Sequence, residues 1–283
     1  MEKHLSKTPI AARFRTALDI ANDVTCFQLF IHERFGETAT QAFERTQARI
    51  ASEAFPENEH AERVDLALNP LIELGLQSAD WGVVHGLMIS IEHVLSYCDE
   101  ARALVSKYRT TQPAKDGELG PEENLRHVME QCDLRKKIDH TFKTATYFRH
   151  IRNHIAHART TPVSTKTNFN RQNANDLNYY WSGKPAKLNN FDFASFDVSR
   201  PLFPEILAAI SVLRITLMEL DECVAQCLPL AAVLMDVRED IMKNAPHLMG
   251  SSGKVLKKIK GTIEMEFGLK MRSKEISEHL NQL

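Results

Sequence analysis

Apolar residues recur at steps of three and four along most of this chain. The pattern is clearest between residues 81 and 109, at Val84, Leu87, Met88, Ile91, Val94 and Leu95. This spacing places the apolar side chains on one face of an α-helix, because a helix has ~3.6 residues per turn. The chain has only 11 glycines and 11 prolines in 283 residues, too few to supply the many turns of an all-β fold. The sequence therefore predicts an all-α fold.

The same reading divides the chain into three parts. Residues 1–79 predict an N-terminal helical extension, in which Gly36 ends the first helix and Pro70 kinks or divides a later one. Residues 80–229 predict a helical bundle that includes one helix over 121–159. Residues 230–283 predict a basic C-terminal helical tail.

Residues 160–200 differ in composition from the rest of the predicted bundle. They contain seven asparagines and show no helical periodicity. We expect a polar, Asn-rich insertion here. A small β-hairpin over 177–188 can form within it, turning at Ser182-Gly183.

Several classes of protein are disfavoured by the sequence. The longest nearly unbroken apolar run, residues 228–235, is far shorter than the ~20 residues that span a bilayer. The N-terminus has no apolar segment of the secretory type. The five cysteines are scattered, which is typical of reduced thiols, and Cys223 and Cys227 are expected as core residues one helical turn apart. We therefore expect a cytoplasmic protein with no membrane partner.

Local charge departs from the net charge of −2, which gives no global reason to expect nucleic acid. Residues 135–159 contain seven Lys or Arg, a single acid (Asp139) and four of the twelve histidines. A stretch with one sign of charge is a candidate phosphate-binding surface. The alternative is a basic face neutralised by acids elsewhere, such as Asp99-Glu100 or Glu122-Glu123.

Within this stretch Arg152, Asn153 and His157 form the pattern R-N-x-x-x-H. It resembles the signature motif of the HEPN family, an Arg followed after four to six residues by His, with Asn favoured after the Arg. Glu92, in the apolar run 87–95, is similar to an acid on the family's first core helix. The resemblance covers about residues 80–228 and leaves both ends of the chain unexplained. It implies a HEPN-like helical bundle and a metal-independent endoribonuclease that acts as a dimer.

These residue types suit that chemistry. Cleavage of RNA without a metal uses the ribose 2′-OH as nucleophile, so the site needs a base that titrates near neutral pH, and His157 takes that role. The Arg152 guanidinium can donate two hydrogen bonds to the charge that develops on the phosphoryl oxygens, and Asn153 can orient a phosphate. We expect supporting roles for Glu92, His154 and His150. RNA phosphates would contact Arg149, Arg159 and Lys143, and no metal or cofactor is expected.

The spacing of the motif predicts a second subunit. On an undistorted helix Arg152 and His157 lie about 140° apart, and Arg152 borders the apolar face. The two side chains can converge only if the helix ends or distorts between them, or if another subunit completes the site. We therefore expect a homodimer with a composite active site.

The function expected from the resemblance is an RNA-cleaving toxin or an anti-phage, abortive-infection-type effector, with an antitoxin or regulatory protein as a possible partner. One alternative is a catalytically inactive helical module that binds RNA, a nucleotide or a protein. A third reading is a metal site, because His150, His154 and His157 share one helix face. Three imidazoles from one straight helix rarely close a tetrahedron, however, and no fourth ligand is evident.

Overall fold

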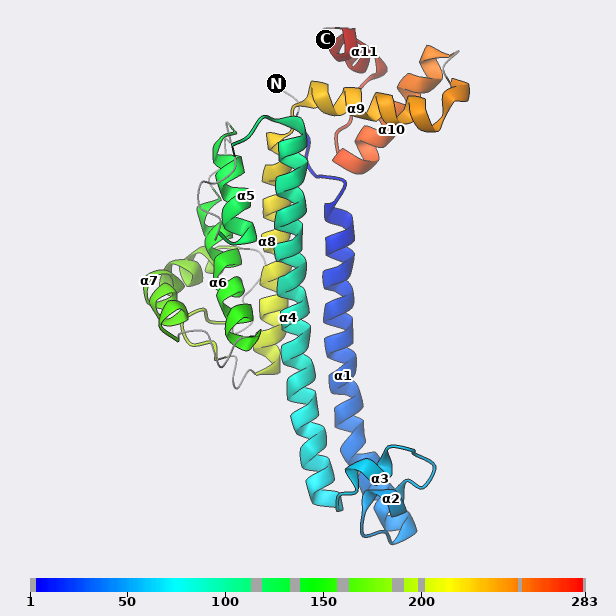
Figure 1. Cartoon of the computed structure of the whole chain (residues 1–283), viewed down its shortest axis with the longest axis vertical. Coiled ribbons are helices and arrows are strands. Elements are labelled where there is room, and N and C mark those ends of the chain that lie inside the picture. Colours follow the sequence, from blue (N-terminus) through cyan, green and yellow to red (C-terminus); the bar gives the residue numbers. More distant parts are fainter. Residues whose placement is uncertain are drawn as a thin grey trace.

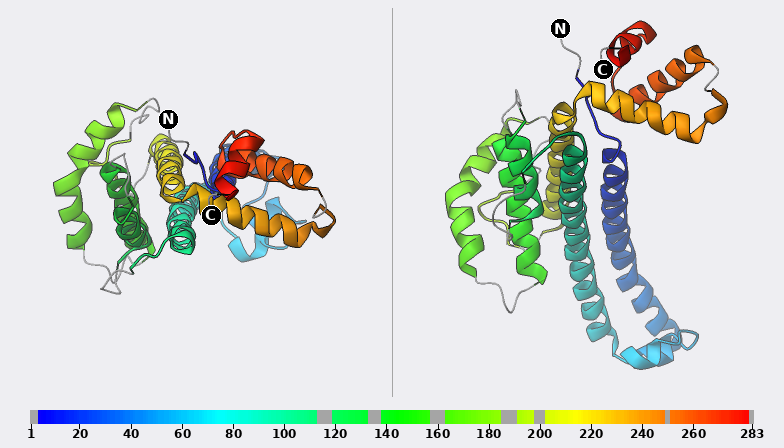
Figure 2. Two further views of the ribbon diagram at one scale, coloured as in Figure 1. Left: turned by 90° about the horizontal axis from the view of Figure 1, so that it is seen from above. Right: turned by 45° about the horizontal axis from the view of Figure 1, so that its top comes forward.

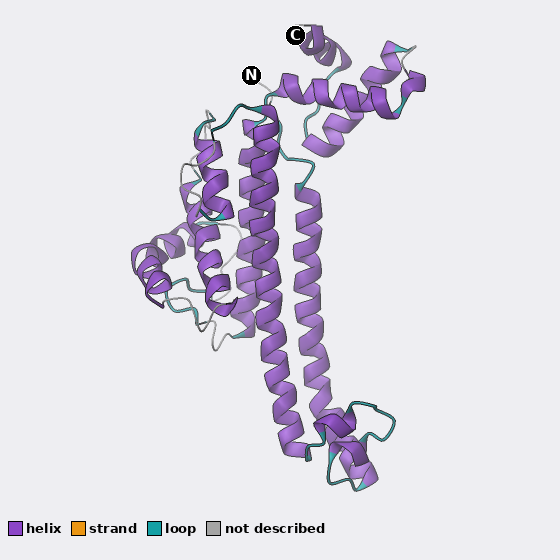
Figure 3. Ribbon diagram, in the orientation of Figure 1, coloured by secondary structure: helices purple, strands orange, loops and turns teal. Residues whose placement is uncertain are grey.

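The protein is described from a computed structural model, which covers residues 4–112, 119–132, 138–156, 163–184, 191–197, 202–248 and 251–281. Every regular element within these ranges is a helix, which confirms the all-α class (Figure 3). The elements are α1 (Ala11–Thr46), α2 (Ala51–Ala54), α3 (Ala61–Val64), α4 (Leu68–Tyr108), α5 (Pro121–Glu130), α6 (Asp139–Ala156), α7 (Val163–Ser182), α8 (Phe203–Cys227), α9 (Leu230–Asn244), the 3₁₀ turn η1 (Pro246–Leu248), α10 (Ser252–Phe267) and α11 (Ser273–Asn281).

Two long helices set the shape of the molecule. α1 and α4 run antiparallel along most of its length, and α2 and α3 close the far end of this hairpin (Figure 1). α8 lies beside α4. Seen from above, helices α5 to α7 and helices α9 to α11 lie on opposite sides of the α4–α8 pair (Figure 2).

The main core forms where α4 and α8 are covered by α1, α5 and α6. α8 is buried along most of its length, and both Cys223 and Cys227 are fully buried in this core, as their helical spacing predicts. A second, smaller core lies at the far end of the hairpin, where α1, α2 and α4 meet around Phe43 and Leu71.

The two helix breaks predicted in the N-terminal part are wrong. α1 passes through Gly36 without interruption and ends at Gln47, which adopts a left-handed conformation with φ of 55°. α4 begins at Leu68, so Pro70 lies in its first turn, where a missing N–H removes no intrahelical hydrogen bond. α4 continues without interruption to Tyr108, so it passes through residue 80, where the predicted extension and bundle would meet.

Glycines allow the two long helices to approach closely. A Cβ atom at Gly82 would collide with the side chain of Gln28, and one at Gly86 would collide with the Thr25 hydroxyl. Both contacts join α4 to α1. The hairpin therefore depends on small residues at this part of the helix–helix contact.

The single helix predicted over 121–159 is also wrong. Its start at Pro121 is confirmed, but α5 ends at Glu130 and α6 begins at Asp139. The two helices pack side by side and antiparallel, since Arg126 lies 3.6 Å from Asp139 and Arg149 lies 2.6 Å from Glu122. The acids of α5 thereby come next to the bases of α6.

The insertion expected at 160–200 forms a helix, and no hairpin is present in its described part; residues 185–188 lie outside that part. α7 covers residues up to Ser182, and Ala174, Leu177 and Trp181 are buried at helical spacing. The Trp181 indole N–H donates to the Thr144 hydroxyl of α6 at 3.0 Å. The apolar positions recur at helical steps, but the many asparagines obscure them.

The segment after α7 adds further apolar residues to the core. Phe191, Phe193 and Phe196 are buried; the first two pack against Tyr147 and Phe148 of α6, and Phe196 packs against Phe191. This part of the predicted polar insertion therefore covers the helix that carries the motif.

The two predicted boundaries between parts of the chain differ in where they fall in the structure. Position 79/80 lies inside α4, whereas 229/230 coincides with the junction between α8 and α9. The C-terminal helices also contact the N-terminal segment, where the Ser6 amide donates to the Phe267 carbonyl at 3.1 Å. No helix in the described ranges has both the length and the apolar composition needed to cross a membrane.

Candidate functional site

The C-terminal half of α6 brings Arg152 and Asn153 next to Glu92 of α4. The Arg152 Nε–H donates to the Glu92 carboxylate, although the two residues are 60 positions apart in the chain. Arg152 Nη1 also donates to the Asn153 side-chain oxygen at 2.9 Å. Two of its nitrogens are thus fixed in position, and Nη2 has no hydrogen-bond partner among the described residues.

Packing of α6 explains this placement. Phe148 and Ile151 are fully buried, so Arg152 lies at the edge of the buried face, as the helical pattern predicts. Its side chain is 33% exposed and that of Glu92 is 43% exposed. The guanidinium is therefore held by the protein and still open to solvent.

The structure places some members of the predicted site and leaves others unplaced. α6 is described as far as Ala156, so His157 and Arg159 lie outside the described residues. His154 is partly buried in the last turn of α6.

Arg149 has a structural partner rather than an open position. Its Nε–H donates to Glu122 Oε1 at 2.6 Å, and its Nη2 lies 3.2 Å from Glu123. The Glu122 side chain is fully buried and also accepts from the Thr146 hydroxyl at 3.0 Å. Arg149 is only 17% exposed, so its charge is used within the chain. This is the neutralisation by Glu122-Glu123 that the sequence offers as an alternative.

Lys143 is also paired. Its ammonium donates to the Asp176 carboxylate of α7 at 2.8 Å, and the His140 ring nitrogen lies 3.2 Å from the other oxygen of that carboxylate. The hydrogen bonds from Lys143 and His140 lower the pKa of Asp176. Because the pair is half-exposed, Lys143 remains within reach of a ligand in a way that Arg149 does not.

The histidines of α6 occupy separate environments. His150 packs against Phe169 of α7, with 5.3 Å between ring centroids. Burial lowers its pKa, and the neighbouring charge of Arg149 lowers it further. Within the described ranges, no group of three or more His, Cys, Asp or Glu could hold a metal ion. His157, the third member of the alternative metal site, lies outside those ranges.

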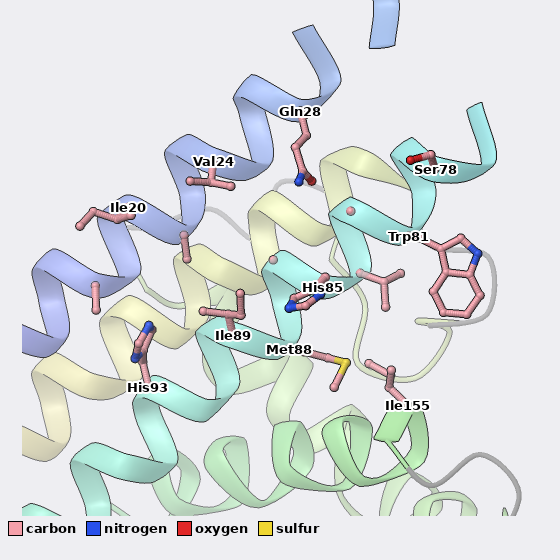
Figure 4. Close-up of a pocket in the computed structure, with 15 residues that line it drawn as sticks. Ile20, Val24, Gln28, Ser78, Trp81, His85, Met88, Ile89, His93 and Ile155 are labelled. Atoms are coloured by element: carbon pink, nitrogen blue, oxygen red, sulfur yellow. The ribbon is translucent and has the colours of Figure 1, made fainter. Parts of the chain in front are cut away.

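An apolar groove borders the candidate site. It has a volume of about 790 Å³ and lies between α1 and α4, with Ile155 at the end of α6 closing one side. Trp81, His85 and Met88 of α4 project into or beside it (Figure 4). His93 also lines it, and burial lowers the pKa of this imidazole against the opposing charge of Glu92.

This groove is not predicted by the motifs of the sequence. The helical spacing of the apolar residues of α1 could have indicated it, because these residues recur on a face that no described part of the chain covers. Comparisons with protein-family models, curated proteins and solved structures give no match to this chain.

Proposed function

We propose that the protein is a metal-independent endoribonuclease whose site is built on the end of α6. The observation that carries the proposal is the arrangement of Glu92, Arg152 and Asn153. It holds a permanently charged guanidinium at the protein surface, and one nitrogen of that group donates to no described residue. Such a preorganised donor suits the negative charge that develops on a phosphoryl group during cleavage.

Each residue has a distinct role in this proposal. Arg152 binds and neutralises the phosphoryl oxygens, and Glu92 with Asn153 orients the guanidinium. His157 accepts the proton of the ribose 2′-OH, whose oxygen attacks the adjacent phosphorus. The bond from phosphorus to the 5′-oxygen breaks, which leaves a 2′,3′-cyclic phosphate on one fragment and, after the 5′-oxygen takes a proton from water, a 5′-hydroxyl on the other. Lys143 and Arg159 would contact neighbouring phosphates. Arg149 is omitted because Glu122 and Glu123 occupy it.

A second subunit completes the site in this account. Arg152 and His157 diverge by about 140° on a regular helix, and a second copy can bring the base of one chain to the guanidinium of the other. An effector that halts growth by cutting RNA, held in check by an antitoxin or regulatory protein, is the biological role proposed for this activity.

A second candidate function is a helical module that binds RNA, a nucleotide or a protein without cleaving. Ion pairing favours the protein-binding form of this candidate, because Lys143, Arg149 and Arg152 all have a carboxylate partner within the chain. These partners reduce the attraction that the basic residues of α6 exert on a polyanion.

The two candidates are separated by an RNA cleavage assay in excess chelator. The ribonuclease proposal predicts fragments with 2′,3′-cyclic phosphate ends. Cleavage should fall at least ~100-fold in Arg152→Ala, because a donor to the developing charge is lost. It should fall nearly as far in Arg152→Lys, since an ammonium lacks the planar fork of a guanidinium.

Arg126→Ala is the matched control, because Arg126 is an ion-paired arginine of α5 outside the motif. It should leave cleavage unchanged. Intact RNA with retained binding would favour the second candidate, and cleavage restored only by zinc or manganese would contradict the metal-independent mechanism.

A further inference from the structure

One face of the α1–α4 hairpin is apolar and uncovered by any described part of the chain. Its large side chains are 39–75% exposed: Ile20, Val24, Phe27, Ile31, Leu74, Trp81 and Ile89. On α1 the positions 20, 24, 27 and 31 follow alternating steps of four and three. This spacing is typical of a helix that packs along another helix.

The face is hollowed along its length. The groove of about 790 Å³ continues into a second one of about 350 Å³ towards the far end of the hairpin, and Ser78 lines both. Figure 4 shows Ile20 and Val24 of α1 on one side and Trp81 of α4 on the other. None of the residues that line the two grooves is Asp, Glu, Lys or Arg, so this surface does not suit a polyanion such as RNA.

The exposed apolar area is most of what a stable interface needs. Taking ~200 Å² for a fully exposed aromatic side chain and ~100–150 Å² for a fully exposed aliphatic one, the seven side chains at their observed exposures present roughly 500–600 Å². The usual requirement is ~800 Å² per partner. The largest apolar patch on a typical monomer is ~300–600 Å² and is often functional.

We infer that a second copy of this chain docks on the α1–α4 face. In a two-fold interface each patch meets its own copy, so grooves lined by no Asp, Glu, Lys or Arg avoid repulsion between fixed like charges near the axis. The face also carries both a projection and a hollow. The Trp81 side chain is 75% exposed and stands beside the groove, where a second copy can receive it while offering its own. Two α1–α4 hairpins would then form a four-helix bundle.

This interface would reach the candidate site. Ile155 lines the groove, and Arg152 precedes it by one turn of α6. Glu92 follows Trp81 by eleven residues, or three turns, along the same face of α4, a rise of about 16 Å. Only this connection to catalysis rests on the proposed function; the docking itself does not.

The mass of the full chain in solution tests the docking without RNA. Sedimentation equilibrium should give twice the 32.2 kDa of one chain. Trp81→Asp and Val24→Asp should each raise the dissociation constant at least ~100-fold, because each puts a charge in the centre of a buried apolar contact. Both positions are exposed in the single chain, so helical content and the urea midpoint extrapolated to low concentration should stay unchanged.

Leu76→Asp is the matched control. Leu76 is on the same helix and 59% exposed, but it lines neither groove, so this variant should remain a dimer. A second readout needs no substitution on the face. Trp181, the other tryptophan, is fully buried, so a fluorescence change on dilution should report Trp81.

Two results would overturn the inference: a wild-type monomer at about 100 μM, well above the micromolar range of specific association, or a Trp81→Asp variant that dimerises like wild type. A wild-type dimer that does not cleave RNA would contradict the ribonuclease proposal and support the interface. A monomeric Trp81→Asp variant that cleaves at the wild-type rate would support the interface and contradict the composite site.

Discussion

The basic helix α6 and the apolar face of the α1–α4 hairpin are two strong patterns in the sequence, and the structure treats them differently. The described bases of α6 have partners within the chain: Glu122 and Glu123 for Arg149, Asp176 for Lys143 and Glu92 for Arg152. The apolar residues of the hairpin face have no such cover among the described residues.

This difference distinguishes the residues that stabilise the fold from those that can bind a ligand or a partner. A charge that is buried and paired, such as Arg149, contributes to the fold. A charge that is paired but partly exposed, such as Arg152, can contribute to the fold and also bind a ligand. An apolar face that no described part of the chain covers adds little to the fold of one chain, so a partner accounts for it best. The burial of a residue and its partners within the chain therefore indicate a functional role better than its residue type does.

The largest effect should come from breaking the most buried ion pair of the described residues. Arg149→Met should lower the free energy of unfolding by about 3 kcal/mol, because it leaves the Glu122 carboxylate buried without its cation. Urea denaturation measures this loss. Adding Glu122→Gln should recover part of it, since the uncompensated charge is then removed. A loss below ~1 kcal/mol would mean that Arg149 behaves as a surface cation.

A smaller effect is expected at Glu219 of α8, which accepts hydrogen bonds from Thr141 and Tyr180 at 2.8 Å each and pairs with Lys184. Burial raises the pKa of Glu219, but the hydrogen bonds from Lys184, Thr141 and Tyr180 outweigh it and leave the pKa below 4.5. Glu219→Gln should lower the free energy of unfolding by about 2 kcal/mol at neutral pH, because donors to a charged acceptor lose strength.

The pH dependence of this difference has a defined sign. With the pKa depressed in the folded state, the unfolded chain takes up the proton first as the pH falls. The stabilisation is therefore complete above pH 4.5, the ordinary value, and disappears as the pH falls through the folded pKa. Urea midpoints of both proteins at neutral and acidic pH check this, and an equal difference at both would contradict the charged network.

The smallest effect is expected at Lys143. Its pair with Asp176 is half-exposed, so Lys143→Gln should change the free energy of unfolding by less than ~1 kcal/mol. Under the ribonuclease proposal the same variant should weaken RNA binding and reduce its salt dependence by about one phosphate contact. A loss comparable to that of Arg149→Met would erase the contrast between buried and exposed pairs of α6.

The sequence was most informative where apolar spacing was uninterrupted. The helical class, the start of α5 at Pro121 and the burial of Cys223 and Cys227 all follow from local patterns. The breaks at Gly36 and Pro70 were wrong because a glycine inside a well-packed helix costs only ~1 kcal/mol and a proline in the first turn costs almost nothing. The hairpin at 177–188 was wrong because Leu177 and Trp181 pack onto α6 despite the surrounding asparagines.

The candidate site was only partly predictable, for a different reason. Glu92 follows from the resemblance of its apolar run to a core helix of the HEPN family, and it does contact Arg152. The partners of Arg149 and Lys143 depend on how α5 and α7 pack against α6, which local spacing does not specify. The groove could be found only from the structure, because the apolar spacing of α1 is the same whether another part of the chain covers that face or leaves it exposed.

Subunit complementation tests the central claim, a site completed by a second copy, most directly. Arg152→Ala and His157→Ala chains would be co-expressed with different tags, and RNA cleavage by the mixed dimers compared with each variant alone. If guanidinium and base come from different chains, each variant alone is inactive and a random mixture recovers about a quarter of wild-type cleavage, since half of the dimers are mixed and each holds one intact site. Cleavage by the mixture no greater than that of the separate variants would contradict the claim.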